Sequence, residues 1–111
     1  MNKGKYEYWK SDANGQWYWH LKAANNKVIL QSEGYHSLAG CGDGIYAMRK
    51  SVSVRDRLLV LISNDSRYYF TIKADNHEIL GASQMYKSIE GCKKGHAAVM
   101  RNRSTKEVVA L

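Results

Sequence analysis

Apolar side chains recur at every second position between residues 17 and 22, where Trp17, Trp19 and Leu21 point to one side of an extended chain. This period of two predicts a half-buried β-strand. Residues 68–73 repeat the pattern. Shorter apolar runs, separated by Asn, Asp and Gly residues that favour turns, predict further strands at 6–10, 27–32, 58–62, 78–83 and 107–111.

After Ser37 the apolar residues switch to helical spacing. They recur at Leu38, Cys41, Ile45 and Met48. The Ser37 hydroxyl is placed to accept a hydrogen bond from an N–H of the first turn, so it is predicted to be the N-cap. Ser88 is predicted to cap a second helix over residues 89–101 in the same way.

The chain repeats itself at a shift of 51 residues. Over residues 17–50, 11 of the 34 aligned pairs are identical, whereas unrelated segments of average composition would share about two. Most mismatches keep the same character, as in Trp19/Phe70 and Leu21/Ile72. Such a repeat indicates a duplicated supersecondary unit. We place repeat one at about residues 5–53 and repeat two at about residues 54–111.

Each repeat is predicted to be β-β-β-α, with residues 107–111 as a closing strand. Hairpin strands with segregated helices favour the α+β class. We expect the tandem repeats to form one antiparallel sheet with two helices packed on one face and pseudo-twofold symmetry. Because a unit of about 50 residues is marginal alone, we expect one shared core. Residues 1–111 then form a single domain, a monomer with internal pseudo-dimer symmetry.

Two motifs occur in both repeats. Lys-Ala-Ala-Asn at 22–25 matches Lys-Ala-Asp-Asn at 73–76, and Ser-Glu/Gln-x-Tyr-x-Ser follows at 32–37 and 83–88. With the small-residue helix behind them, these motifs resemble the YegP-like family of small duplicated bacterial proteins over nearly the whole chain. The resemblance implies one sheet built from both repeats, two helices packed on it and exchanged terminal strands. It brings no biochemical activity and no catalytic residues to carry over.

The composition restricts the class of partner. The formal net charge of +7 favours long-range attraction to polyanions or acidic partners. No apolar run approaches the roughly 20 residues of a membrane span, and no apolar stretch typical of a secretory signal follows Met1. We therefore expect a cytoplasmic protein without a membrane partner. Cys41 and Cys92 occupy matched positions and are expected to be buried, reduced thiols.

The polar face of the two alternating strands is the main candidate for a binding surface. Its residues are Tyr18, His20 and Lys22 in repeat one and Tyr69, Thr71 and Lys73 in repeat two. Aromatic rings beside cations on an open sheet are typical of single-stranded nucleic-acid binders, which stack bases and neutralise phosphates. The same residue types are also ordinary on a solvated sheet face.

The second predicted helix carries another basic strip. Lys94 and Arg101 are seven residues apart and therefore share one helix face. A solvated helix face is the ordinary explanation of such a strip, and an anion-binding patch is the alternative.

No group of residues has the spacing of a known catalytic or cofactor site. The glycines at 40, 42 and 44 lie inside the predicted helix, so they do not form a phosphate loop, and they are expected to let the helix approach the sheet closely. Cys92 and His96 are spaced i,i+4 as two metal ligands, but no second close pair completes a zinc site. We predict no catalytic, metal or cofactor site.

The favoured function is a non-catalytic, small basic binding or interaction module, whose partner is an unknown protein or a polyanion. A sequence-tolerant binder of single-stranded nucleic acid that uses the exposed sheet face is the alternative. An enzyme of undefined activity is the third hypothesis.

Overall fold

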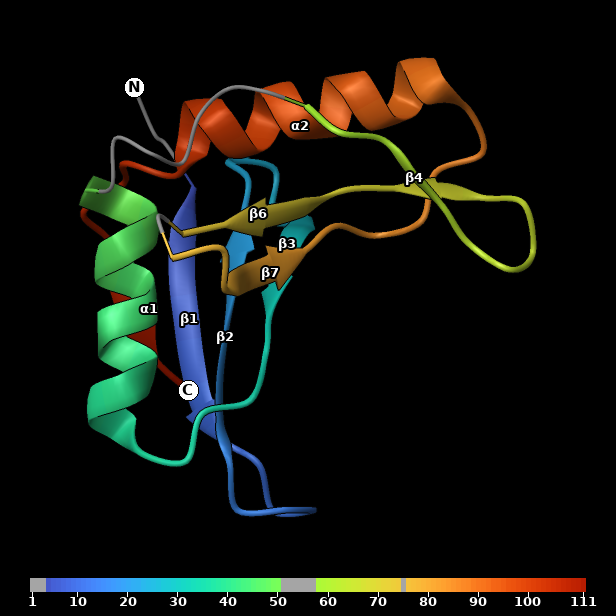
Figure 1. Cartoon of the computed structure of the whole chain (residues 1–111). Coiled ribbons are helices and arrows are strands. Elements are labelled where there is room, and N and C mark those ends of the chain that lie inside the picture. The colour runs from blue at the N-terminus through green and yellow to red at the C-terminus, as the bar shows by residue number, and fades with distance from the viewer. Residues whose placement is uncertain (1–3, 51–57, 75) are drawn as a thin grey trace.

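A computed structural model describes residues 4–50, 58–74 and 76–111 (Figure 1). In repeat one, the strands β1 (Lys5–Lys10), β2 (Trp17–Lys22) and β3 (Val28–Ser32) precede helix α1 (Leu38–Lys50). Repeat two contains β4 (Leu61–Ile62), β5 (Tyr68–Tyr69), β6 (Thr71–Lys73), β7 (Ile79–Ala82), helix α2 (Ile89–Asn102) and β8 (Val108–Ala110). Both helices begin at the predicted residue.

The described strands form two sheets. Six of them pair in the order β6-β7-β3-β2-β1-β8, and β4 pairs with β5 alone. Neighbouring strands are antiparallel except β1 and β8, which are parallel. The predicted fold class is confirmed, with a mixed sheet in place of a wholly antiparallel one. Hairpin turns fix the antiparallel pairs within each repeat, whereas β8 reaches β1 from the far end of α2, where no hairpin sets its direction.

The strand predicted over residues 68–73 is interrupted at Phe70. Phe70 N donates to the Ser83 hydroxyl at 3.0 Å, so a side chain replaces a backbone acceptor at this point. Trp19 N makes the matching contact with Ser32 Oγ at 2.9 Å, but β2 stays continuous because β1 pairs along all of it. In repeat two, within the described residues, β4 pairs with β5 alone, so β5 lies outside the main sheet and the β4–β5 hairpin projects beyond it (Figure 1).

The two repeats join through β3 and β7. Gln31 lies opposite Ala82, which is the same position of the other repeat, 51 residues later. When a residue in one strand lies opposite its own equivalent from the other repeat in an antiparallel pair, a local two-fold axis passes between the two strands. The structure therefore has the symmetry of a dimer within one chain.

Both repeats contribute to one buried core. Its members are Tyr6, Trp19, Leu21, Ile29, Leu30, Cys41, Ile45, Met48, Phe70, Ile72, Leu80, Cys92 and Val99. Figure 1 shows α1 beside β1 and α2 above β2 and β3. Neither described helix has the length and apolarity needed to cross a membrane.

Local sequence signals set the element ends. The Ser37 hydroxyl accepts from Gly40 N and the Ser88 hydroxyl accepts from Gly91 N, both at 3.0 Å, as predicted for N-caps. In the two matched turns, Asn26 has a φ of 69° and His77 a φ of 67°. His77 therefore adopts the left-handed conformation that histidine tolerates less readily than glycine.

The helix glycines accommodate tyrosine rings. A Cβ added at Gly44 would overlap the Tyr35 hydroxyl, and one added at Gly95 would overlap the Tyr86 hydroxyl. The sequence predicts that these glycines let the helices approach the sheet closely. At Gly44 the Trp19 indole of β2 also lies 3.1 Å from an added Cβ, and in both repeats a tyrosine from the loop before the helix packs against the glycine. Gly42, in contrast, has nothing within 4 Å of an added Cβ.

Gly95→Ala is expected to lower the free energy of unfolding by about 1 to 3 kcal/mol, because the new methyl must displace the Tyr86 ring. Gly42→Ala is the matched control and should raise it by up to about 1 kcal/mol, since alanine favours a helix and meets no neighbour. Urea unfolding followed by circular dichroism measures both. Equal effects of the two substitutions would contradict the proposed packing.

Candidate functional site

The helix-free face of the main sheet carries one row of side chains across all six strands. The row, read through the strand pairs, consists of Thr71, Ala82, Gln31, His20, Glu7 and Val109. The helices pack on the opposite face, where the Trp19 indole lies near Gly44 of α1 and the Phe70 ring contacts His96 of α2 at a centroid distance of 5.2 Å. Because successive side chains of a strand point to opposite faces, the same strands place core residues on one face of the sheet and this row on the other.

A carboxylate organises the centre of this face. Glu7 is only 5% exposed, and its Oε1 lies 2.7 Å from His20 Nε2 and 3.0 Å from Lys22 Nζ. Lys5 Nζ approaches Oε2 at 3.6 Å. Hydrogen bonds from His20 and then Lys22 lower the pKa of Glu7 from 4.5 to about 2. Glu7 is therefore ionised throughout the physiological range and fixes the surrounding cations in place.

An aromatic pair borders this ion cluster. The Trp9 ring stacks on Tyr18 with centroids 6.1 Å apart and planes 22° apart, and it also contacts His20 at 4.8 Å. The Tyr18 hydroxyl accepts from the Asn14 amide at 2.9 Å. Both aromatic side chains are partly exposed. We call Lys5, Glu7, Trp9, Tyr18, His20 and Lys22 the β1–β2 surface.

The structure brings together only part of the predicted site. Tyr18, His20 and Lys22 lie together, and His20 and Lys22 are ion-paired with Glu7. Tyr69 lies in the small β4–β5 sheet, opposite Leu61, and Lys73 is exposed on the edge strand β6. The matched positions of the two repeats therefore do not form one continuous platform.

Lys94 and Arg101 are exposed on α2 and do not join the β1–β2 surface. They lie on a helix that packs against the other face of the sheet. Any anion contact they make is therefore separate from one made by Tyr18 and Lys22.

Sequence reasoning missed Lys5, Glu7 and Trp9. The signal was available, because Tyr6 and Tyr8 alternate with them along β1, and Tyr6 is fully buried. What the alternation could not show is that β1 lies beside β2 with Glu7 opposite His20. That register creates the ion cluster.

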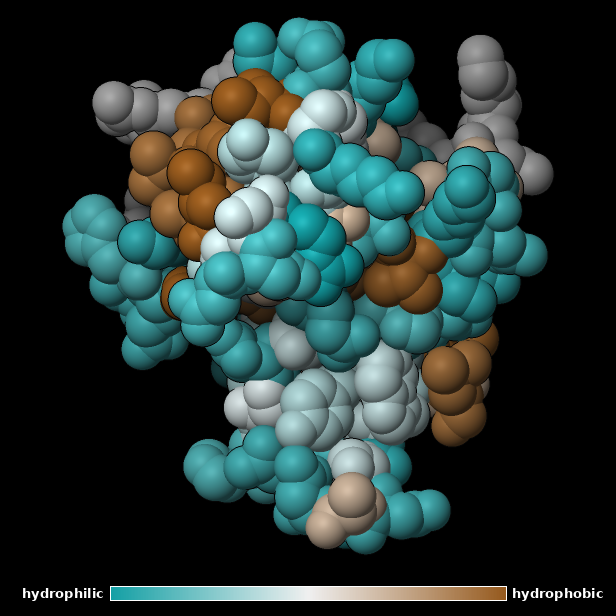
Figure 2. Space-filling model, turned by 90° about the vertical axis from the view of Figure 1, so that its right-hand side faces the viewer, coloured by the Kyte–Doolittle hydropathy of each residue, from teal (hydrophilic) through white to brown (hydrophobic). Residues whose placement is uncertain are grey.

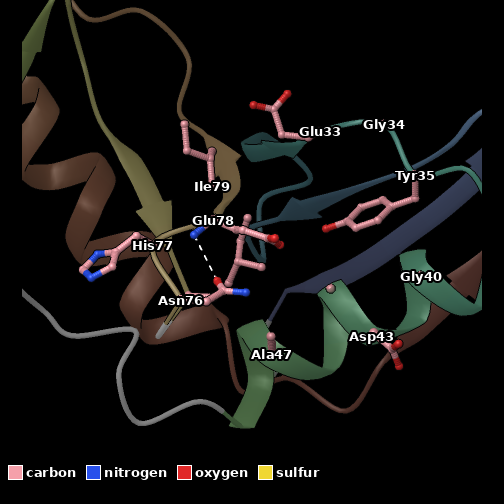
Figure 3. A pocket seen from close by; sticks show the side chains of 13 residues that line it. Glu33, Gly34, Tyr35, Gly40, Asp43, Ala47, Asn76, His77, Glu78 and Ile79 are labelled. Carbon is pink, nitrogen blue, oxygen red and sulfur yellow. Dashed lines mark hydrogen bonds between the residues drawn. The ribbon is translucent and has the colours of Figure 1, made fainter.

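A second feature is a cleft of about 810 Å³ where α1 meets the turn before β7 (Figure 3). Its walls include Tyr35 and three carboxylates, those of Glu33, Asp43 and Glu78. Figure 3 shows Glu78 and the Tyr35 ring pointing toward each other across the cleft, whereas Glu33 and Asp43 lie at the rim and point outward. Burial raises the pKa of the Tyr35 hydroxyl.

The equivalent positions of the other repeat carry different charges. The 51-residue shift places Gln84, Lys94 and Lys27 at the positions of Glu33, Asp43 and Glu78. Three carboxylates of one repeated surface therefore correspond to two lysines and one neutral glutamine in the other.

The two cysteines are free and fully buried, as predicted. Burial raises the pKa of Cys41 to about 11 and raises that of Cys92 as well. Both thiols are therefore protonated and poorly nucleophilic at neutral pH. Among the described residues, no three His, Cys, Asp or Glu side chains gather as a metal site would require.

Glu7→Gln tests the ion cluster. The Glu7 carboxylate stabilises the fold above pH 4.5, and this stabilisation is lost as the pH falls toward 2, because the unfolded chain binds the proton first. The variant should therefore lose on the order of 1 to 3 kcal/mol of unfolding free energy at pH 7 and show a shallower acid dependence. Urea unfolding at pH 7, 4 and 3 measures both effects, with Glu33→Gln as the exposed-carboxylate control. Identical pH slopes for Glu7→Gln and wild type would refute this role.

Comparisons with known proteins agree with the fold. A family model described as a domain of unknown function, DUF1508, matches residues 12–57 and again residues 63–109. The chain is 36% identical over 102 residues to the UPF0339 protein YegP of Yersinia pestis, covering 92% of this chain and 90% of that protein. It is 37% identical over 105 residues to a UPF0339 protein of Pasteurella multocida, covering 95% and 91%.

Two solved structures are similar over almost the whole chain. The solution structure of yegP from E. coli, titled a protein of unknown function, has a TM-score of 0.88 at 33% identity and covers 99% of this chain and 94% of its own. The solution structure of a UPF0339 protein from Shewanella oneidensis also has a TM-score of 0.88, at 36% identity, covering 99% and 92%.

Proposed function

The chain belongs to the DUF1508 family, whose description assigns no activity, and from its own side chains we propose that it is a non-catalytic binding module that recognises its ligand through the β1–β2 surface. The observation that carries this proposal is the arrangement around Glu7. One ionised carboxylate orders His20 and Lys22 beside two partly exposed aromatic rings, on a face that both helices leave open. Preordered side chains lose little entropy on binding, which favours recognition.

The second candidate is a binder of single-stranded nucleic acid. Trp9 and Tyr18 support it, because a partly exposed aromatic pair offers a face on which bases stack. Lys5 and Lys22 add positive charge, and together they outweigh the single negative charge of Glu7. The excess positive charge of the chain supports attraction to phosphates.

A protein partner is the competing ligand class for the same surface. Trp and Tyr are also the side chains that dominate protein interfaces. The two classes differ in salt dependence, because phosphate contacts release counterions.

The buried, protonated thiols of Cys41 and Cys92 fit the reducing cytoplasm that we propose as the location.

Titration of a fluorescein-labelled oligothymidylate of 20 nucleotides tests the nucleic-acid candidate. At 20 mM salt we expect an increase in anisotropy, and between 20 and 200 mM we expect affinity to fall steeply with salt. Trp9→Ala should weaken binding about tenfold, because one stacked base is lost. Tyr46→Ala is the matched control, since Tyr46 is an aromatic residue exposed on α1, and should change affinity less than twofold.

The absence of binding at 20 mM salt would rule out the nucleic-acid candidate. Binding that Lys94→Ala and Arg101→Ala abolish, while Trp9→Ala leaves it unchanged, would move the site to α2. Either result would remove the β1–β2 surface as the proposed nucleic-acid site.

A further inference from the structure

A groove of about 360 Å³ lies between α1 and the two strands at the β8 edge of the main sheet. Strand alternation places Tyr8 of β1 and Val108 of β8 on the face that carries the helices, and both side chains line the groove. Glu7 and Trp9 point to the opposite face of β1. A ligand bound in the groove therefore does not use the β1–β2 surface.

One face of α1 forms the other wall of the groove. The lining residues recur at helical spacing from the first residue of the helix to its last turn: Leu38, Cys41, Gly42, Ile45, Tyr46 and Arg49. Leu38 and Arg49 are 11 residues apart, which along a helix is about 16 Å. A volume of about 360 Å³ spread over this length makes a narrow groove that fits an extended chain.

The floor of the groove is apolar and its middle is open. Cys41 and Ile45 are buried beneath it, and burial raises the pKa of Cys41 to about 11, so the thiol there is uncharged at neutral pH. A Cβ added at Gly42 would meet no atom within 4 Å. Glycine disfavours a helix, but at this position its missing side chain leaves the groove unfilled. Tyr46 is 63% exposed and Leu38 is 48% exposed, so the walls present apolar surface to a ligand.

A cation lies at one end of the groove. Arg49 is in the last turn of α1, and its Nε donates to Thr105 O at 2.8 Å, which orients the guanidinium plane. None of the ion pairs formed by the described residues includes Arg49. The other N–H groups of a guanidinium bind carboxylate oxygens well. The groove therefore combines an apolar channel with a charge that an anionic ligand complements.

The equivalent face of α2 lacks this combination. The 51-residue shift places Lys93, Ala97 and Met100 at the positions of Gly42, Tyr46 and Arg49. In repeat two a long side chain thus replaces the glycine, and the terminal cation is absent. Substitutions on α2 consequently provide matched controls for the groove of repeat one.

Other hollow or apolar parts of the described surface suit an anion less well. Figure 2 shows the side of the molecule that bears the β4–β5 hairpin, which also has hydrophobic surface. Leu59 and Ile62 are exposed apolar residues of this segment, but its arginine, Arg67, already pairs with Asp65 at 2.8 Å. The larger cleft beside α1 is lined by three carboxylates, which repel a negative charge.

We propose that the groove between α1 and β8 binds a straight-chain alkyl carboxylate, of the kind found in fatty acids. The carboxylate contacts the Arg49 guanidinium, and the alkyl tail lies along α1 across Gly42 toward Leu38. Burial of the tail against Ile45 and Val108 supplies the affinity, because each methylene removed from water contributes favourably. The net charge of +7 adds long-range attraction for the anion.

Nuclear magnetic resonance titration of the full ¹⁵N-labelled chain with sodium octanoate at pH 7 tests the proposal. We expect shifts of the backbone amides of residues 38–49 and of Val108. Decanoate, which is two methylenes longer, should bind about tenfold more tightly. Octanol, which has the tail without the charge, should bind at least tenfold more weakly than octanoate.

Gly42→Leu fills the middle of the groove and should weaken octanoate binding at least tenfold. The variant is expected to fold, because an added Cβ meets no neighbour and leucine favours a helix. Lys93→Leu, at the equivalent position of α2, is the matched control and should change the affinity less than twofold.

Arg49→Met introduces the residue of repeat two and tests the charge. It should weaken octanoate binding at least tenfold and octanol binding less than twofold. Arg49→Lys keeps the positive charge and should bind octanoate within fivefold of wild type. The amide spectrum of each variant shows whether the loss of the bond to Thr105 O has altered the fold.

The proposal is overturned if millimolar octanoate shifts no amide of residues 38–49, or if the shifts centre on residues 59–62. Equal losses of octanoate and octanol in Arg49→Met would also overturn it, because Arg49 would then act on the shape of the groove alone. A dimer in light scattering that Leu38→Lys dissociates would assign the groove to a second copy of the chain and would likewise contradict the proposal.

Discussion

Gln31 and Ala82, the same position in the two repeats, lie opposite each other across β3 and β7, and this pairing creates the single core. Each repeat alone, at about 50 residues, is marginal as an independent fold. Close to the local axis the two repeats cannot both carry a large side chain. Leu30 is buried there, and its equivalent is Gly81, where an added Cβ would lie 2.9 Å from the Leu30 side chain and 3.0 Å from Gln31 O. The symmetry of the backbone therefore requires asymmetry in the side chains.

The same principle extends to the surface. Trp9 lies opposite Tyr18 and Leu61 lies opposite Tyr69, so Glu7, the ionised centre of the β1–β2 surface, corresponds to Leu59 of repeat two. An ion cluster and an exposed apolar side chain therefore occupy equivalent places. Asp43, which lines the cleft beside α1, corresponds to Lys94 on α2. Duplication supplied two copies of each surface, and substitution of a few side chains gave them different chemistry.

Features set by neighbouring residues could be predicted from the sequence. Helix starts follow from Ser37 and Ser88, and the inward direction of Trp19 and Phe70 follows from strand alternation. Features set by distant contacts could not. The parallel direction of β8 depends on the path of the chain after α2. The position of Tyr69 in a separate sheet depends on strand pairing, because β1 pairs along all of β2, whereas β4, within the described residues, pairs with β5 alone. The ion pair of Lys22 depends on Glu7 in a neighbouring strand, whose register no local pattern reveals.

Native-state hydrogen exchange measured amide by amide tests most directly whether the two repeats share one core through β3 and β7. If they do, the slowest amides of β2, β3, β7 and both helices exchange with one common free energy of opening, equal to that of global unfolding. The β4–β5 hairpin, which lies outside the main sheet, exchanges at a lower free energy. Two distinct opening free energies, one for each repeat, would show that the halves unfold independently and would contradict this account.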